Sequence, residues 1–229
     1  MPASASVVNR PAFVTWIAAA WEESDSMAGE ARRRDPDRRA RLLEAAVAAF
    51  AARGFHATTT RDIAAAAGMS PAAIYVHHES KEELLYQISR SGHESVLEQL
   101  RAAIATADDP AAQLVAAMRA FVRHHATRHT VARIVNYELA ALSDEHLREI
   151  RQLRRAITAE LRAVVDRGVA EKVFDTPDPR MATTVLLSLG VDIARWYRAN
   201  HPVSPARLAD FYADVALRVV GYRPADRSE

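Results

Sequence analysis

The chain has 229 residues, enough for one sizeable domain or two small ones. It contains no cysteine, which excludes disulfides, thiolate metal sites and cysteine nucleophiles and fits a reducing cytoplasm. The formal net charge of +1 excludes a polybasic coat for nucleic acid, so any basic surface must be local. The apolar stretch at 12–21 is about half the ~20 residues that a membrane span needs, so we expect a cytoplasmic protein without a membrane partner.

Residues 1–34 lack a regular pattern and form an extension of unknown role, in which Met27 offers an alternative translation start. Beyond them one helix-start signal recurs. A residue that can cap the helix is followed by proline at the first helical position, where its missing N–H is no loss. These signals lie at Asp35, Ser70, Asp109, Asp178 and Ser204, and further caps are predicted at Thr59, Ser80 and Ser143.

The spacing of apolar residues predicts an all-α protein of about nine helices, because no sustained alternation typical of strands occurs. The predicted helices are 36–53, 60–67, 71–77, 81–105, 110–128, 131–141, 144–170, 179–199 and 205–221. We expect them to form a three-helix N-terminal domain over 35–82 and a larger helical domain over 83–222, followed by a tail over 223–229.

Two short helices joined by a tight turn mark the N-terminal domain. The first follows the cap at Thr59, Gly68 permits the turn, and Ser70 with Pro71 starts the second helix. Two short helices joined by a glycine-containing turn of three or four residues are the signature of a helix-turn-helix. The pattern therefore predicts a DNA-binding domain.

The stretch RLLEAAVAAFAARGFHATTTRDIAAAAGMSPAAIYVHHESKEELL, residues 41–85, resembles the DNA-binding domain of the TetR family of transcriptional regulators. The resemblance departs at His78, where the family commonly has an aromatic residue. It implies a ligand-released repressor that is no enzyme, needs no cofactor and binds a palindromic operator in double-stranded DNA as a homodimer. Helix 71–77 would lie in the major groove.

Small residues begin the predicted recognition helix, so it can approach base edges closely but offers few hydrogen bonds. We expect the DNA sequence to be read chiefly by Thr60, Arg61 and His77. Phosphate contacts, which position the protein without reading sequence, are implied by the resemblance for Thr59, Tyr75, His77 and Lys81. The whole predicted DNA-binding set is Thr59, Thr60, Arg61, Ser70, Pro71, Ala72, Ala73, Tyr75, His77 and Lys81.

The last two predicted helices have wide apolar faces. Such faces can be ordinary core, or they can form a four-helix interface between two copies. TetR family proteins resemble this layout and dimerise through their final two helices. The predicted dimer interface consists of Met181, Val185, Leu189, Phe211, Val215 and Val219.

Polar residues within the apolar segments VNYELAAL and LSLGVDIARWYRA are candidates for an effector pocket: Asn136, Tyr137, Asp192, Arg195 and Trp196. The segments resemble the ligand domain of TetR family repressors of fatty-acid or sterol catabolism, several of which sense acyl-CoA thioesters. The resemblance implies a small apolar or acyl-CoA effector. The arginines Arg119, Arg123, Arg128 and Arg133 would either meet its phosphates or form a solvated helix face.

The histidines do not predict a metal site. His77 and His78 are adjacent on a helix, so their side chains diverge by about 100°. His125 and His129 have a metal-ligand spacing but straddle a predicted helix end. No GxSxG motif or glycine-rich phosphate loop occurs either. A helical adaptor that does not bind DNA, a histidine metal-binding protein and a transcriptional activator remain open alternatives.

Overall fold

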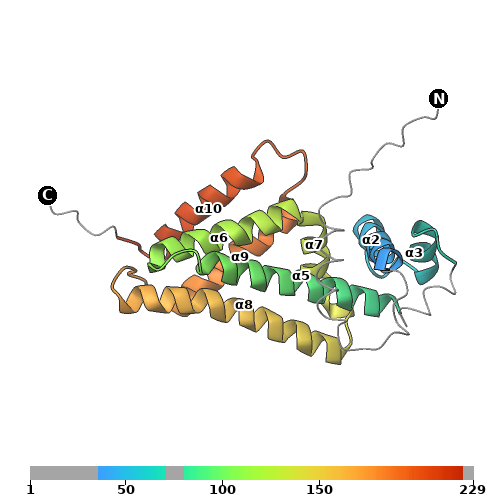
Figure 1. Ribbon diagram of the computed structural model, residues 1–229, viewed down its shortest axis with the longest axis horizontal. Coiled ribbons are helices and arrows are strands. Elements are labelled where there is room, and N and C mark those ends of the chain that lie inside the picture. The colour runs from blue at the N-terminus through green and yellow to red at the C-terminus, as the bar shows by residue number, and fades with distance from the viewer. Residues whose placement is uncertain (1–35, 71–79, 224–229) are drawn as a thin grey trace. The chain divides into compact units, whose positions relative to one another are not determined.

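The computed structural model describes residues 36–70 and 80–223 (Figure 1). Within these ranges the chain forms eight α-helices and one short 3-10 helix, and no strand. The all-α prediction is therefore confirmed, while the predicted helix 71–77 lies outside the described residues. The chain divides into two compact units between Leu84 and Leu85, two residues beyond the predicted boundary.

The first unit contains α2 (Pro36–Arg53), α3 (Thr60–Ala66) and the first turn of α5 (Lys81–Ile104). Gly54, with φ of 79°, ends α2 in the left-handed conformation that glycine adopts without strain. The wholly buried Thr58 donates its hydroxyl to the carbonyl of Gly54 at 2.8 Å. The core of this unit is apolar and consists of Leu42, Leu43, Phe50, Phe55, Ile63 and Leu84.

Six of the predicted caps begin helices, as their hydrogen bonds show, whereas Asp35 and the helix predicted after Ser70 lie outside the described residues. Thr59 and Asp62 form a capping box at α3, in which the Thr59 hydroxyl accepts from the Asp62 N–H at 3.1 Å. Asp109 accepts from the N–H of Ala111 at 2.9 Å, where α6 begins. The same role is confirmed for Ser80, Ser143, Asp178 and Ser204.

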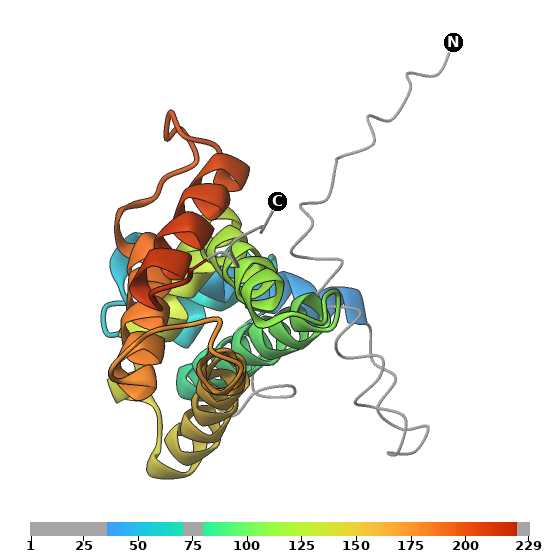
Figure 2. The same cartoon turned by 90° about the vertical axis from the view of Figure 1, so that its left-hand side faces the viewer.

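The second unit holds the rest of α5 and five further α-helices. These are α6 (Pro110–Thr127), α7 (His129–Tyr137), α8 (Asp144–Ala170), α9 (Pro179–Trp196) and α10 (Pro205–Val219), with a 3-10 helix at Leu139–Ala141. In Figure 2, α10 lies beside α6 and α9. The apolar faces of the helices of this unit pack into one core, in which Leu114, Leu161 and Leu186 are wholly buried.

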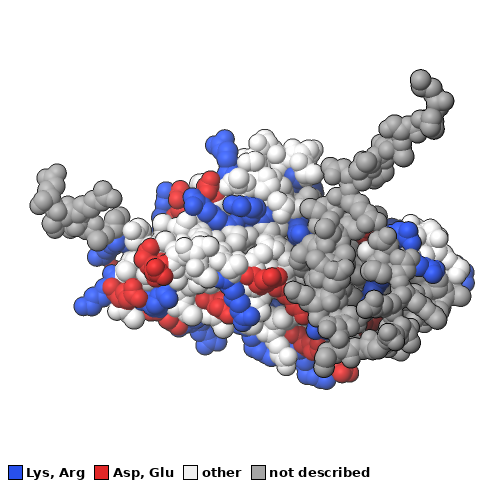
Figure 3. All heavy atoms as spheres, in the orientation of Figure 1, with Lys and Arg blue, Asp and Glu red and all other residues white. Residues whose placement is uncertain are grey.

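Charged side chains cover the outside of this unit in opposite-sign pairs. Figure 3 shows blue and red atoms intermixed over the left-hand part of the drawn face. Arg101 on α5 donates to Glu160 on α8 at 2.6 Å, and Arg119 on α6 lies 2.7 Å from Asp210 on α10. Among the described residues, no helix is long and apolar enough to span a membrane.

Candidate effector cavity and DNA-binding surface

The structure describes half of the predicted DNA-binding residues. Thr59, Arg61 and Ser70 are exposed, and Thr60 is partly exposed at the start of α3. These positions leave Arg61 free to reach a DNA molecule, and DNA contact by this group remains a prediction. Lys81 completes the described half, and the other five residues lie outside the described residues: Pro71, Ala72, Ala73, Tyr75 and His77.

Lys81 has a structural task within the first unit. Its Nζ donates to the carbonyls of Phe55 at 2.9 Å, His56 at 3.3 Å and Thr58 at 2.9 Å. The same ammonium lies 4.4 Å from the centroid of the Phe55 ring. A lysine has three N–H donors, so these carbonyls use all of them. The lysine thus links the loop after α2 to the start of α5. These hydrogen bonds compete with the predicted phosphate contact.

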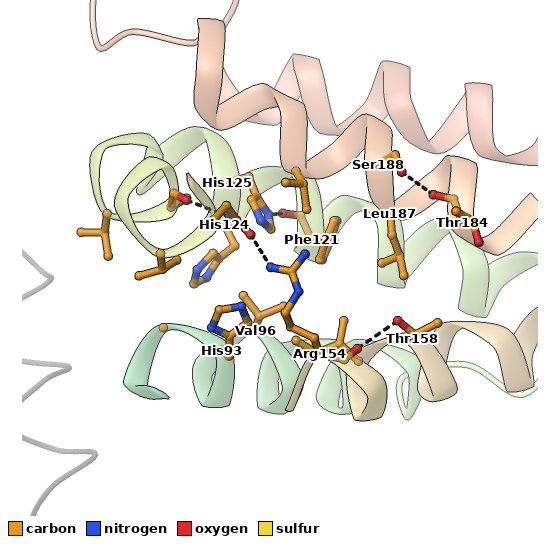
Figure 4. A pocket seen from close by; sticks show the side chains of 17 residues that line it. His93, Val96, Phe121, His124, His125, Arg154, Thr158, Thr184, Leu187 and Ser188 are labelled. Atoms are coloured by element: carbon orange, nitrogen blue, oxygen red, sulfur yellow. Dashed lines mark hydrogen bonds between the residues drawn. The ribbon is translucent and has the colours of Figure 1, made fainter. Parts of the chain in front are cut away.

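A cavity of about 260 Å³ lies inside the second unit, between five helices (Figure 4). A close-packed interior leaves few voids larger than a water molecule, so a space of this size is a candidate binding site. Its lining comes from α5 (Gly92, His93, Val96), α6 (Phe121, His124, His125), α7 (Val131, Ala132, Val135, Asn136), α8 (Arg154, Ile157, Thr158) and α9 (Thr184, Leu187, Ser188, Val191). Thr158, Thr184 and Ser188 are exposed, so this side of the cavity meets solvent.

Arg154 reaches into the cavity from α8, and Figure 4 shows its guanidinium in the space between α8 and α6. Its Nη1 donates to Oδ1 of Asn136 at 3.0 Å, and Asn136 in turn donates to the carbonyl of Ala132 at 2.8 Å. Burial lowers the pKa of this guanidinium from its usual value. No carboxylate among the described residues pairs with Arg154. A positive charge therefore faces the cavity without an opposite charge.

Three buried histidines line the same cavity. Burial lowers the pKa of His93 and of His125 to about 4, and it lowers the pKa of His124 well below the usual range. Nδ1 of His93 lies 2.7 Å from the carbonyl of Ser89, and Nδ1 of His125 lies 2.8 Å from that of Phe121. A carbonyl can only accept, so each Nδ1 carries the proton and each Nε2 is left as an acceptor. The histidines are thus neutral at pH 7.

The predicted pocket residues lie only in part at this cavity. Asn136 lines the cavity, but Tyr137, Asp192, Arg195 and Trp196 do not. Tyr137 is half exposed, and Trp196 packs against the core from the end of α9. Asp192 accepts from Arg195 at 2.7 and 3.1 Å, which explains the lowered pKa of this carboxyl. The polar residues of this segment therefore satisfy one another on the surface.

The apolar face predicted for a dimer interface is open to solvent in the single chain. Met181 is 58% exposed and Phe211 is 62% exposed, and Val185 and Leu189 are exposed as well. Val215 and Val219 are half buried, so they contribute less to this face. We call Met181, Val185, Leu189 and Phe211 the α9–α10 face. A group of large exposed apolar side chains usually marks a surface that another molecule covers.

Comparisons with known proteins agree with this arrangement. Residues 42–88 match the family model of bacterial regulatory proteins of the tetR family, and residues 107–220 match the tetracyclin repressor-like C-terminal domain. The transcriptional repressor KstR2 of Rhodococcus jostii is 29% identical over 182 residues, which cover 79% of this chain and 89% of KstR2.

Solved structures share the fold. A crystal structure of a regulatory protein of the tetR family from Rhodococcus RHA1 is 38% identical, with a TM-score of 0.78 over 82% of this chain and 99% of that one. AibR, solved with isovaleryl coenzyme A and operator DNA, has a TM-score of 0.73 over 82% of this chain and 100% of its own. At 22% identity, AibR shows likeness of fold alone.

A helix-turn-helix unit followed by a larger helical unit with an internal cavity defines a class of transcription regulators. The chain belongs to the TetR family, as its N-terminal residues predicted. The members of this family are transcriptional regulators and not enzymes, which confirms that part of the prediction.

Proposed function

We propose that this protein is a homodimeric repressor that binds a near-palindromic operator and is released by a small effector held in the cavity. Each subunit would place the helix predicted at 71–77 in a major groove, with Arg61 reading bases nearby. Two such helices must lie about 34 to 36 Å apart, or at a related spacing, to meet successive turns of one DNA face.

The cavity is the observation that carries this proposal. A domain that served only for dimerisation would gain stability by filling about 260 Å³ with side chains. An effector that fits only one arrangement of the helices shifts the population toward that arrangement. The free energy of DNA binding is then weakened by the difference between the effector's binding free energies for the two arrangements.

The α9–α10 face supports the dimer. Burying four large apolar side chains between two copies would remove them from water, and a two-fold interface covers the same face on both subunits. Two-fold symmetry of the protein would then match two-fold symmetry of the operator.

Acyl-CoA thioesters of fatty-acid or sterol catabolism are the first effector class to test. The likeness to the repressor KstR2 and the presence of a largely apolar cavity support this choice. The arginines predicted to meet coenzyme phosphates do not line the cavity, and Arg119 pairs with Asp210. A phosphate-bearing part would therefore lie outside the lined space.

The test combines mass and DNA binding. Sedimentation velocity should give the mass of two chains, and anisotropy with DNA from upstream of the protein's own gene should show tight binding that weakens with salt. A monomer without DNA affinity at low salt would instead support a helical adaptor. An effector that strengthens DNA binding would make the protein an activator or a co-repressor-dependent regulator.

A further inference from the structure

We infer that the effector carries a carboxylate inside the cavity and that Arg154 of α8 binds it. The inference rests on the proposed function, because it names the chemical group that the same cavity selects. It concerns the buried end of the effector, whereas a coenzyme or another large group would extend beyond the cavity.

The charge balance of the cavity leads to this assignment. Arg154 is the charged residue of the lining, and its side-chain partner among the described residues is the neutral amide of Asn136. A guanidinium taken out of water without an anion costs free energy that a hydrogen bond to an amide offsets only in part. An incoming carboxylate would supply the missing charge in the planar two-oxygen form that a guanidinium binds best.

Asn136 holds the guanidinium ready for that partner. Its side-chain amide is fixed at both ends, by the carbonyl of Ala132 on α7 and by Nη1 of Arg154. One N–H of Arg154 is thus committed, and a guanidinium has five N–H donors in all. The arginine is therefore oriented before the effector binds and keeps donors for it.

The rest of the lining fits the body of such an acid. Phe121, Ile157, Leu187 and Val191 contribute apolar side chains to the lining from three helices. The cavity of about 260 Å³ suits a small acid or the acyl part of a thioester, while its solvent-facing side leaves room for a larger group outside the lined space.

Two sources can provide this carboxylate, and matched probes separate them. Octanoate and octanamide differ in charge at nearly equal size, so they test a free acid. Glutaryl-CoA and pentanoyl-CoA have the same number of acyl carbons, but only the glutaryl group ends in a carboxylate. Each probe is added to the full-length protein, and affinity is measured by calorimetry and by the shift in melting temperature.

The variant Arg154→Met removes the charge but keeps much of the side-chain volume, and Arg155→Met is its matched control on the exposed side of α8. We expect at least one acidic probe to bind the wild type and Arg155→Met at least tenfold more tightly than its neutral counterpart. Arg154→Met should lose about ten- to a hundredfold of that affinity. Binding of octanoate identifies a free acid, and binding of glutaryl-CoA identifies an acidic acyl group.

Several results would overturn the inference. They are equal binding of acidic and neutral probes, unchanged acid binding by Arg154→Met, and no binding of either acid by the wild type. A large fall in the melting temperature of ligand-free Arg154→Met, absent from Arg155→Met, would assign the arginine to the fold instead. DNA titrations of the same samples without probe report on the proposed function separately, because Arg154 belongs to the second unit.

Discussion

The ring of Phe121 lies directly against Gly190 of α9: a Cβ built on this glycine would stand 2.5 Å from Cδ1 and Cε1 of the ring. No real Cβ approaches a carbon so closely, so the ring occupies its position only because residue 190 has no side chain. Phe121 also lines the cavity. The glycine thereby helps to set the width of the binding site.

Gly190→Ala should push the Phe121 ring toward the cavity. Overpacking of this kind costs about 1–3 kcal/mol of unfolding free energy, and we expect it to weaken binding of any cavity ligand. Gly168→Ala is the matched control, because its Cβ would likewise overlap an aromatic ring, that of Phe174, and neither residue lines the cavity. Urea denaturation measures the stability of both variants, and calorimetry measures their ligand affinity. An equal loss of ligand affinity in the two variants would show that residue 190 does not shape the cavity.

Lys81→Met should destabilise the N-terminal unit by about 2 kcal/mol, since three carbonyls lose a charged donor. In the wild type the three donors of Lys81 are already used by these carbonyls. Under conditions where the variant is folded, the salt dependence of its DNA binding should therefore be nearly unchanged. The exposed Arg61 provides the contrast: because it is proposed to read bases, Arg61→Ala should cost about 1–3 kcal/mol of operator affinity and relax sequence preference. If Lys81→Met lowers the salt slope of DNA binding and leaves the stability unchanged, the predicted phosphate contact of Lys81 is supported.

Phe211→Glu should convert the protein to monomers, because it places a charge on the exposed apolar α9–α10 face. The expected result is half the wild-type mass in sedimentation velocity and a large loss of operator affinity. Tyr137→Glu is the control, since Tyr137 is similarly exposed on α7. If Phe211→Glu keeps the wild-type mass, the subunits do not meet through this face.

Acid should destabilise the second unit through its buried histidines. The pKa of His93 and of His125 is about 4 in the folded chain, against 6.5 for an exposed histidine. Between these values the unfolded chain binds more protons, so the free energy of unfolding falls as the pH drops from about 6.5 to about 4. Urea midpoints across this window should fall less for His125→Leu than for the wild type. Parallel curves would mean that His125 is not neutral when folded.

Helix positions could be predicted from the sequence because their signals are local. Asp109, Asp178 and Ser204 each cap a helix within three residues of themselves, and each helix begins where predicted. The sequence predicts the start of α7 two residues late, at 131, whereas the helix begins at His129. Its N-cap, Arg128, makes no side-chain capping bond, so no local signal marks this start.

The cavity could be predicted only in part, because its lining converges from five helices. Asn136 is predicted from its place as a polar residue in an apolar segment, but Arg154, His93 and His124 are not. A signal for Arg154 was present: Ile150, Ile157 and Leu161 form the buried stripe of α8, and residue 154 falls on the same side at helical spacing. An arginine on a buried stripe marks either an ion pair or a ligand site, and only the structure shows that no carboxylate among the described residues pairs with it.

The central claim is that one molecule couples DNA binding to occupation of the cavity. The most direct test adds a ligand that binds the cavity, identified by calorimetry, to a preformed complex of the protein with fluorescent DNA from upstream of its own gene. We predict that anisotropy falls to the value of free DNA, with half release at the ligand concentration that half fills the cavity. A ligand that saturates the cavity while DNA affinity stays unchanged would contradict the account.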